Sequence, residues 1–186
     1  MQFGHVCPWW MGYLLASPLR RLAQNPHTVL EPHVQSGMTV FEPGPGMGFF
    51  TLELARLVGD KGRVIAVDVQ PKMLRALARR AQKAGLRERI ALRELAGERM
   101  GVDDLAGQVD LVLAFAMVHE LPNAASFFQE VSSVLKSTGK VLLAEPKGHV
   151  DMESWSKTLQ LAEDAGLRKE TDLAICRSHA ALLAKL

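Results

Sequence analysis

The chain has 186 residues, of which 48% are hydrophobic and 23% are charged, and it carries a net charge of +2 at pH 7. This composition is ordinary for a folded globular protein and argues against intrinsic disorder. The length suits one sizeable core, so we expect a single domain spanning residues 1–186. A net charge this small gives no concentrated basic surface, and we expect no nucleic-acid partner.

The sequence also bears on the compartment. Its longest apolar runs, such as residues 111–118, are far shorter than the roughly 20 residues that a membrane-spanning helix needs. The first 15 residues lack the basic segment and small-residue cleavage site of a secretion signal. Two cysteines, Cys7 and Cys176, give no disulfide framework. We therefore expect a cytoplasmic protein that does not associate with membranes.

Residues 1–37 are rich in aromatic residues and proline, which predicts short helices broken by turns. We interpret this segment as an N-terminal helical cap. Asn25 before Pro26 is typical of a helix start and predicts a helix running towards Val34. The aromatic residues of the cap either seal one edge of the core or form a lid over a pocket; they are Trp9, Trp10 and Tyr13.

From residue 39 onward, short apolar segments alternate with segments of helical periodicity. The expected strands are 39–42, 63–68, 89–92, 109–115 and 140–145, and the expected helices are 49–58, 71–84, 126–134 and 154–165. Two strand-like runs then follow each other directly, at 168–175 and 179–185, and predict a terminal antiparallel hairpin. This pattern indicates an open, doubly wound α/β fold whose mostly parallel sheet is mixed at one edge.

The sequence FEPGPGMGFF, residues 41–50, joins the first expected strand to the first expected helix. Gly44, Gly46 and Gly48 allow a tight turn and a close approach of the backbone to a ligand, and a helix start offers free N–H groups. This combination predicts a site for a nucleotide-like molecule.

The spacing separates two kinds of nucleotide site. The dinucleotide fingerprint needs a third glycine three residues after the second, and Phe49 stands there. Glu42, at the end of the strand, would balance a cationic amino group and repel a pyrophosphate. Asp68, at the end of the next strand, would accept hydrogen bonds from ribose hydroxyls. Together these residues favour a zwitterionic, sulfonium-bearing ligand over NAD.

Four stretches carry a family resemblance: EPGPGMGFFTLELA, VIAVDVQPKML, DLVLAFAMVHELPN and FFQEVSSVLKSTGKVLLAEP. In this order they resemble the class I S-adenosylmethionine-dependent methyltransferases over about residues 37–186. The resemblance implies a Rossmann-like, seven-stranded sheet with an antiparallel C-terminal strand, and S-adenosylmethionine as the cofactor. It also implies that Glu42 and the loop from Gly44 to Gly48 hold the methionine moiety, that Asp68 holds the ribose, and that Val69 and Phe115 face the adenine and the cofactor's inner side.

One segment departs from the family pattern. Members often have an aspartate just after the third strand that accepts a hydrogen bond from the adenine amino group, and Ala96 stands at the matching position here. We expect Ala96 and Gly97 to line the adenine, with Glu98 or a main-chain carbonyl as the acceptor.

Methyl transfer from a sulfonium depends mainly on alignment and exclusion of water, and a base is needed only for a protonated acceptor. His119 is the candidate base, since it titrates near neutral pH and follows a strand end; alternatively, it is a structural histidine that opens a helix. Glu145 either takes a proton or orients its loop. Cys7 and Cys176 are either small buried residues or a thiol pair for a soft metal or metalloid; we assign no metal site.

These observations predict a methyltransferase that uses S-adenosylmethionine for in-line transfer to a small-molecule acceptor. The alternatives are methylation of a protein or RNA, a non-catalytic module that binds S-adenosylmethionine or S-adenosylhomocysteine, and NAD-dependent oxidoreduction. Cofactor binding without any methylated product would identify the second of these.

Overall fold

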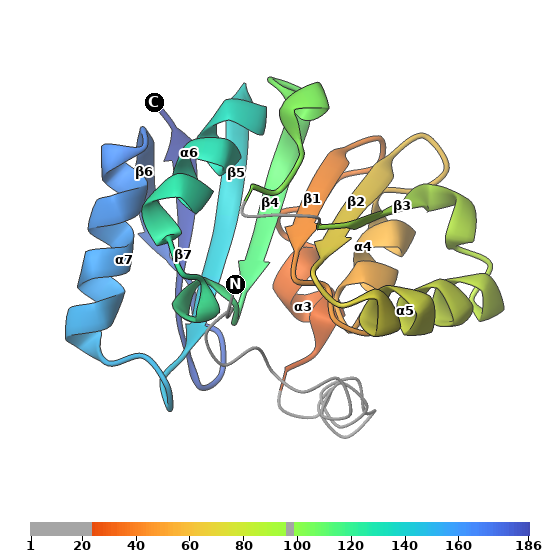
Figure 1. The fold of residues 1–186 in the computed structure, drawn as a ribbon, viewed down its shortest axis with the longest axis horizontal. Helices are drawn as coiled ribbons and strands as arrows, with labels where there is room; N and C mark the ends of the chain where they lie inside the picture. Colours follow the sequence, from red (N-terminus) through yellow and green to blue (C-terminus); the bar gives the residue numbers. More distant parts are fainter. Residues whose placement is uncertain (1–23, 96–98) are drawn as a thin grey trace. The chain divides into compact units, whose positions relative to one another are not determined.

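The computed structural model describes residues 24–95 and 99–186 (Figure 1). These residues fall into two compact units, 24–95 and 99–186, which are considered one at a time. Most of the predicted N-terminal cap, including Trp9, Trp10 and Tyr13, lies outside the described residues. No helix within the two described ranges is both long enough and apolar enough to span a bilayer.

The first unit consists of three parallel strands and their helices, and its strand order is β3-β2-β1 (Figure 1). In chain order the elements are α3 (Pro26–Leu30), β1 (Thr39–Pro43), α4 (Thr51–Leu57), β2 (Arg63–Asp68), α5 (Pro71–Lys83), the 3₁₀ helix η1 (Arg87–Arg89) and β3 (Ile90–Glu94). Glu42 of β1 lies opposite Ala66 of β2, and Asp68 of β2 lies opposite Glu94 of β3. The carboxyl ends of the three strands therefore meet at one edge of the unit.

The second unit has the strand order β4-β5-β7-β6. Its elements are η2 (Asp103–Leu105), β4 (Val109–Phe115), η3 (Val118–Glu120), α6 (Ala124–Val134), β5 (Leu135–Pro146), α7 (Met152–Asp164), β6 (Leu167–Asp172) and β7 (Ser178–Lys185). Strand β4 is parallel to β5, whereas β7 is antiparallel to both β5 and β6. The predicted fold class, a mostly parallel seven-stranded sheet with an antiparallel strand at the C-terminus, is confirmed.

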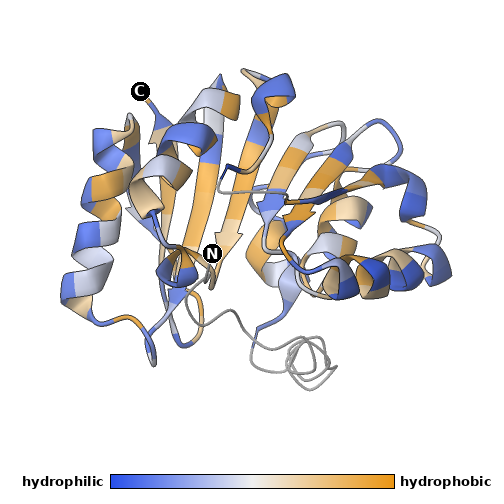
Figure 2. Ribbon diagram, in the orientation of Figure 1, coloured by the Kyte–Doolittle hydropathy of each residue, from blue (hydrophilic) through white to orange (hydrophobic). Residues whose placement is uncertain are grey.

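The strands are apolar along most of their length, and the exposed faces of the helices are polar (Figure 2). Residues 141–144 of β5 are all buried, as expected for a strand covered on both faces. Strand β6 is different, because every residue after Leu167 is exposed. Charged side chains along this outer strand hinder pairing with another chain.

Most predicted boundaries shift by one to three residues, β6 for example ending at Asp172 and not at 175, and three differences have a visible local cause. Asn25 caps α3 as expected, its side chain accepting from the His27 N–H at 3.0 Å, but the helix ends at Leu30. Helix α4 begins at Thr51, since residues 46–50 form turns. The turn expected at 137–139 lies inside β5, where residues 136–139 bulge out of the pairing with β4. Gly139 fits there because a Cβ would lie 2.9 Å from the Val109 carbonyl oxygen.

Candidate functional site

The glycine loop follows β1 and is fixed by backbone hydrogen bonds, one to β2 and one within the loop. The Gly44 N–H donates to the Val67 carbonyl oxygen at 2.9 Å, and the Gly48 N–H donates to the Pro45 carbonyl oxygen at 2.9 Å. The φ angles of Gly44, Gly46 and Gly48 are 68°, 53° and 82°. Residues with a Cβ rarely adopt this left-handed region, which explains glycine at all three positions.

Two of these glycines have different surroundings. A Cβ on Gly48 would lie 2.3 Å from Leu77 Cδ1 of α5, so this glycine allows close packing of the loop on the helix. A Cβ on Gly46 would meet no atom of the described residues within 4 Å. Arg80 of α5 also donates from Nη1 to the Met47 carbonyl oxygen. Gly48 is therefore a packing residue, whereas Gly46 lies beside open space.

Glu42 is a buried carboxyl group at the end of β1, with 4% of its surface exposed. Among the described residues, neither Glu42 Oε2 nor the nearby Thr51 Oγ1 has a hydrogen-bond partner. Burial raises the pKa of Glu42 to about 8; Thr51 lies close enough to lower this pKa in part, without hydrogen-bonding geometry, and Asp68 raises it further. A buried acceptor atom without a donor is costly, and a cationic donor such as an ammonium group would offset that cost.

Asp68 lies at the end of β2 and connects to the glycine loop. Its Oδ2 accepts from the Gly46 N–H at 3.2 Å, and its Oδ1 accepts from the Gln70 N–H at 2.8 Å. An ionised carboxylate only accepts hydrogen bonds and has about four acceptor positions, which is the chemistry that ribose hydroxyls need. Val69, the next residue, is half-buried.

Most of the segment predicted to contact adenine lies outside the residues that the structure describes. Ala96, Gly97 and Glu98 are not among the described residues. The Leu95 N–H donates to the Asp68 carbonyl oxygen at 3.0 Å, so this segment begins beside the ribose-binding candidate. Glu42, Gly44, Gly46, Asp68 and Val69 lie at or just after the ends of β1 and β2 in the first unit, and their role in cofactor binding stays a prediction.

In the second unit, the candidate residues follow the ends of β4 and β5. Phe115, the last residue of β4, is half-buried. Ala116 follows with φ 55°, an uncommon conformation for a residue with a Cβ, and its N–H donates to the Ala144 carbonyl oxygen at 2.7 Å. This bend starts the short connection to η3, which carries His119.

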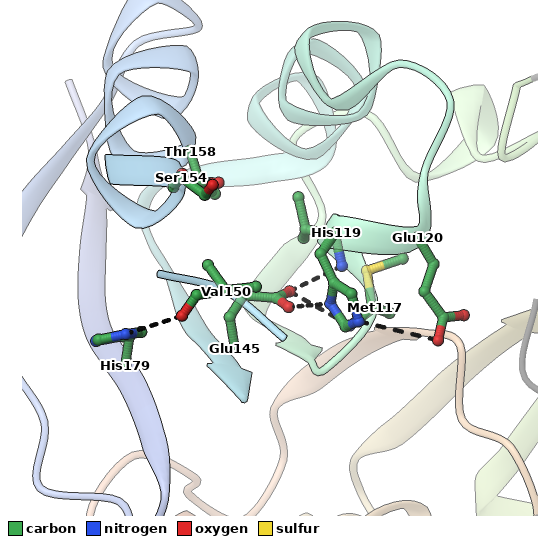
Figure 3. Close-up of polar contacts among 9 residues, drawn as sticks. Met117, His119, Glu120, Glu145, Val150, Ser154, Thr158 and His179 are labelled. Carbon is green, nitrogen blue, oxygen red and sulfur yellow. Dashed lines mark hydrogen bonds and ion pairs between the residues drawn. The ribbon is translucent and has the colours of Figure 1, made fainter. Parts of the chain in front are cut away.

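His119 and Glu145 form a direct pair (Figure 3). His119 Nδ1 contacts Glu145 Oε2, and Glu145 Oε1 accepts from the N–H groups of Val118 at 2.8 Å and Met117 at 3.3 Å. Glu145 is 1% exposed, whereas 20% of the His119 side chain is exposed. The hydrogen bond to Glu145 raises the pKa of His119; the charges of Glu145 and Glu120 also raise it, and burial opposes them.

Three more polar residues follow β5 or lie on β7, and one of them contacts the pair. His149 contacts the His119 ring edge to face, with 5.5 Å between the ring centroids. His179 donates from Nε2 to the Val150 carbonyl oxygen at 3.1 Å (Figure 3) and stacks on Trp155. Lys147, after β5, is exposed and donates its backbone N–H to the Arg177 carbonyl oxygen.

The thiol-pair hypothesis stays untested, because Cys7 lies outside the described residues; Cys176, between β6 and β7, is exposed. Within residues 24–95 and 99–186, no group of three or more potential ligand side chains is arranged for a metal ion.

The sequence reasoning missed two contacts. Thr51 was not linked to Glu42, although it opens the helix that follows the glycine loop. Glu145 and His119 were considered separately, although parallel neighbouring strands end at the same edge of a sheet. The pairing of β4 with β5 was the signal that would have joined them.

Residues 34–179 match the model of a family described as a methyltransferase domain. The chain belongs to this family. Its fold agrees with this assignment, because the structure of an S-adenosylmethionine-dependent methyltransferase from Aquifex aeolicus superposes on it with a TM-score of 0.85. The superposition covers 97% of this chain and 100% of the Aquifex chain, and the two sequences are 24% identical. S-adenosylmethionine is therefore the cofactor of this methyltransferase domain, and the buried acceptor of Glu42 and the open glycine loop fit it.

Two curated relatives differ in their acceptors. A ribosomal protein L11 methyltransferase of Pelotomaculum thermopropionicum is 32% identical over 116 residues, which are 62% of this chain and 34% of that protein. A ubiquinone/menaquinone biosynthesis C-methyltransferase of a Shewanella species is 24% identical over 119 residues, which are 64% of this chain and 47% of that protein. The matched stretches thus span less than half the length of either relative.

Proposed function

We propose that this methyltransferase domain transfers the methyl group of S-adenosylmethionine to a small-molecule acceptor. The observation that carries the cofactor part of the proposal is the Glu42 carboxyl group, buried at a strand end beside the glycine loop with no donor for Oε2 among the described residues. A cationic amino acid moiety supplies the missing donor.

Each predicted cofactor residue has a role in this proposal. Glu42 pairs with the ammonium group, and Gly44 and Gly46 leave room for the methionine moiety, while Gly48 holds the loop against α5. Asp68 accepts from the ribose hydroxyls. The remaining contacts are to the adenine and to the inner side of the cofactor, from Val69, Ala96, Gly97 and Phe115.

The bound cofactor supplies an electrophilic methyl group on a sulfonium. The protein aligns the acceptor with that methyl group and excludes water. Where the acceptor carries a proton, His119 is the base that removes it. This role relies on the position of His119 after β4, since open α/β sheets bind ligands at the carboxyl ends of their strands.

Two observations favour different acceptor classes. The quinone-biosynthesis relative acts, by its name, in the production of small molecules, which supports a small acceptor. The ribosomal protein methyltransferase, at 32% identity, supports a protein acceptor as the second candidate. Methylation of a protein needs an exposed docking surface, whereas a quinol-sized molecule needs only an enclosed site.

Calorimetry and a labelling assay test the proposal. S-adenosylhomocysteine is titrated first, with NAD as the control ligand, and then methyl-labelled S-adenosylmethionine is incubated with a set of phenols and quinols or with a ribosomal extract. We expect S-adenosylhomocysteine to bind, NAD not to bind, and label to enter a small molecule. Label in a protein band would support the second candidate. Binding without any labelled product would indicate a non-catalytic module, and tight binding of NAD alone would overturn the proposal.

A further inference from the structure

We propose that Glu145 is a positioning residue that fixes His119 with Nε2 as the general base, and that the acceptor of this domain must lose a proton when it is methylated. This inference rests on the proposed function and narrows the acceptor to compounds with an acidic hydroxyl, ring N–H or activated C–H group.

The backbone around the pair leaves Glu145 little freedom. Oε1 accepts from the N–H groups of both Met117 and Val118, and N–H groups only donate. Oε2 then faces His119 Nδ1. The connection that carries these N–H groups starts at Ala116, whose left-handed conformation is held by the bond to the Ala144 carbonyl oxygen. Ala144 immediately precedes Glu145, so both residues of the pair are fixed to the same pair of strands.

This arrangement sets the tautomer of His119. Because its partner is a carboxylate oxygen, Nδ1 carries the ring proton and donates a hydrogen bond to Glu145. Nε2 of the neutral ring then has a free lone pair. The two side chains also differ in solvent exposure: the Glu145 carboxylate is covered, whereas the His119 imidazole is partly exposed. The basic member of the pair, His119, is therefore also the more exposed member.

Three titratable groups of the described residues face the imidazole. Glu145 of β5 contacts Nδ1, Glu120 of η3 has Oε1 4.0 Å from Nε2, and His149 after β5 contacts the ring. The two carboxylates stabilise the protonated ring, so the pKa of His119 is raised above its ordinary value of 6.5. A base with a raised pKa accepts a proton more readily, but it is active only above that pKa.

The acceptor X–H gives its proton to His119 Nε2 while an electron pair on X forms the new bond to the methyl carbon. The carbon–sulfur bond breaks, and its electron pair stays on sulfur, which becomes a neutral thioether. The products are X–CH₃, S-adenosylhomocysteine and an imidazolium held by Glu145, which returns its proton to water.

The test uses the nearly isosteric substitution Glu145→Gln in the full chain. The side-chain carbonyl oxygen of the introduced glutamine would still accept from Met117 and Val118, but its amide would donate to His119 Nδ1 and move the ring proton to Nε2. Nitrogen NMR of the free protein reads the tautomer and the pKa of His119 directly. We expect the proton on Nδ1 in the wild type, on Nε2 in the variant, and a lower pKa in the variant.

Kinetics give the second readout, with the acceptor found in the labelling assay. We expect kcat of Glu145→Gln to fall by roughly 100-fold or more and its dependence on pH to move to lower pH. His119→Asn keeps an amide donor for Glu145 while removing the base, and we expect a similar loss. Acceptors that are ionised before they bind should be methylated at nearly wild-type rates by both variants.

Two matched controls separate position from charge. Glu120→Gln removes a nearby charge without contacting Nδ1, so it should leave the tautomer unchanged. Glu53→Gln alters another Glu–His pair, with His27 at 3.0 Å, and should leave both readouts of His119 unchanged.

A wild-type His119 protonated on Nε2 would overturn the inference, as would wild-type kcat in Glu145→Gln. The proposed function is tested separately: if the wild type binds no S-adenosylhomocysteine, that proposal fails, while the NMR result still decides the tautomer.

Discussion

The Asp68 carboxylate accepts a hydrogen bond from the Gly46 N–H across 3.2 Å. The same carboxylate accepts from the Gln70 N–H through its other oxygen. One side chain thus holds the glycine loop after β1 to the end of β2, at the position where we predict the ribose. Loss of this side chain should affect both the loop and the cofactor.

Asp68→Ala should weaken binding of S-adenosylhomocysteine by about 1.5–3 kcal/mol, because two hydrogen bonds to the ribose are lost. Calorimetric titration measures this loss. Asp103→Ala is the matched control, since Asp103 is exposed and pairs only with Arg99 among the contacts described, and it should bind normally. Wild-type affinity in Asp68→Ala would mean that the ribose assignment is wrong.

Glu42 should make the protein less stable as pH rises. Its pKa is about 8 in the folded protein and 4.5 ordinarily, so the folded state binds more protons between these values. The contribution of Glu42 to the free energy of unfolding is therefore fully present below pH 4.5. It falls as the pH rises to 8, by as much as roughly 1.4 kcal/mol per pH unit. Urea unfolding at pH 5, 6, 7 and 8 measures the slope, and Glu42→Gln should reduce it. Equal slopes in the two proteins would contradict the role of burial.

Cofactor binding should release a proton from Glu42. At pH 7 the free side chain is mostly protonated, and an ammonium group placed beside Oε2 favours its ionised form. Titrations of S-adenosylhomocysteine in buffers of different ionisation enthalpy count the released protons. We expect up to about one proton for the wild type and fewer for Glu42→Gln; the same count in both would argue against contact between Glu42 and the amino group.

Gly46 and Gly48 should respond differently to alanine, although both have positive φ. Both variants lose about 1 kcal/mol of stability from the left-handed conformation. Gly48→Ala should lose a further 1–3 kcal/mol, since its Cβ would overlap Leu77. Thermal unfolding compares the two proteins. Gly46→Ala should in addition weaken cofactor binding. Equal losses of stability in the two variants would contradict the packing role of Gly48.

Much of the first unit could be predicted from sequence because its signals are local. Alternating apolar runs located β1, β2 and α5, and the glycine spacing located the loop between β1 and α4. The start of α4 was misplaced by two residues, since Phe49 and Phe50 suit a helix but lie in the turn that the left-handed Gly48 requires. The bulge at 136–139 could not be predicted either, because a serine–threonine–glycine run is typical of a turn. Only the pairing of Leu135 and Lys140 with β4, on either side of this run, makes it part of a strand.

The sequence by itself determined the order of strands and helices, the loop that suits S-adenosylmethionine and the two acidic residues at strand ends, because each depends on residues close together in the chain. Only the tertiary structure decided that Glu42 is buried without a donor among the described residues, since burial depends on packing around β1. It also decided that His119 contacts Glu145. These residues are 26 positions apart, and only the parallel pairing of β4 with β5 brings them together.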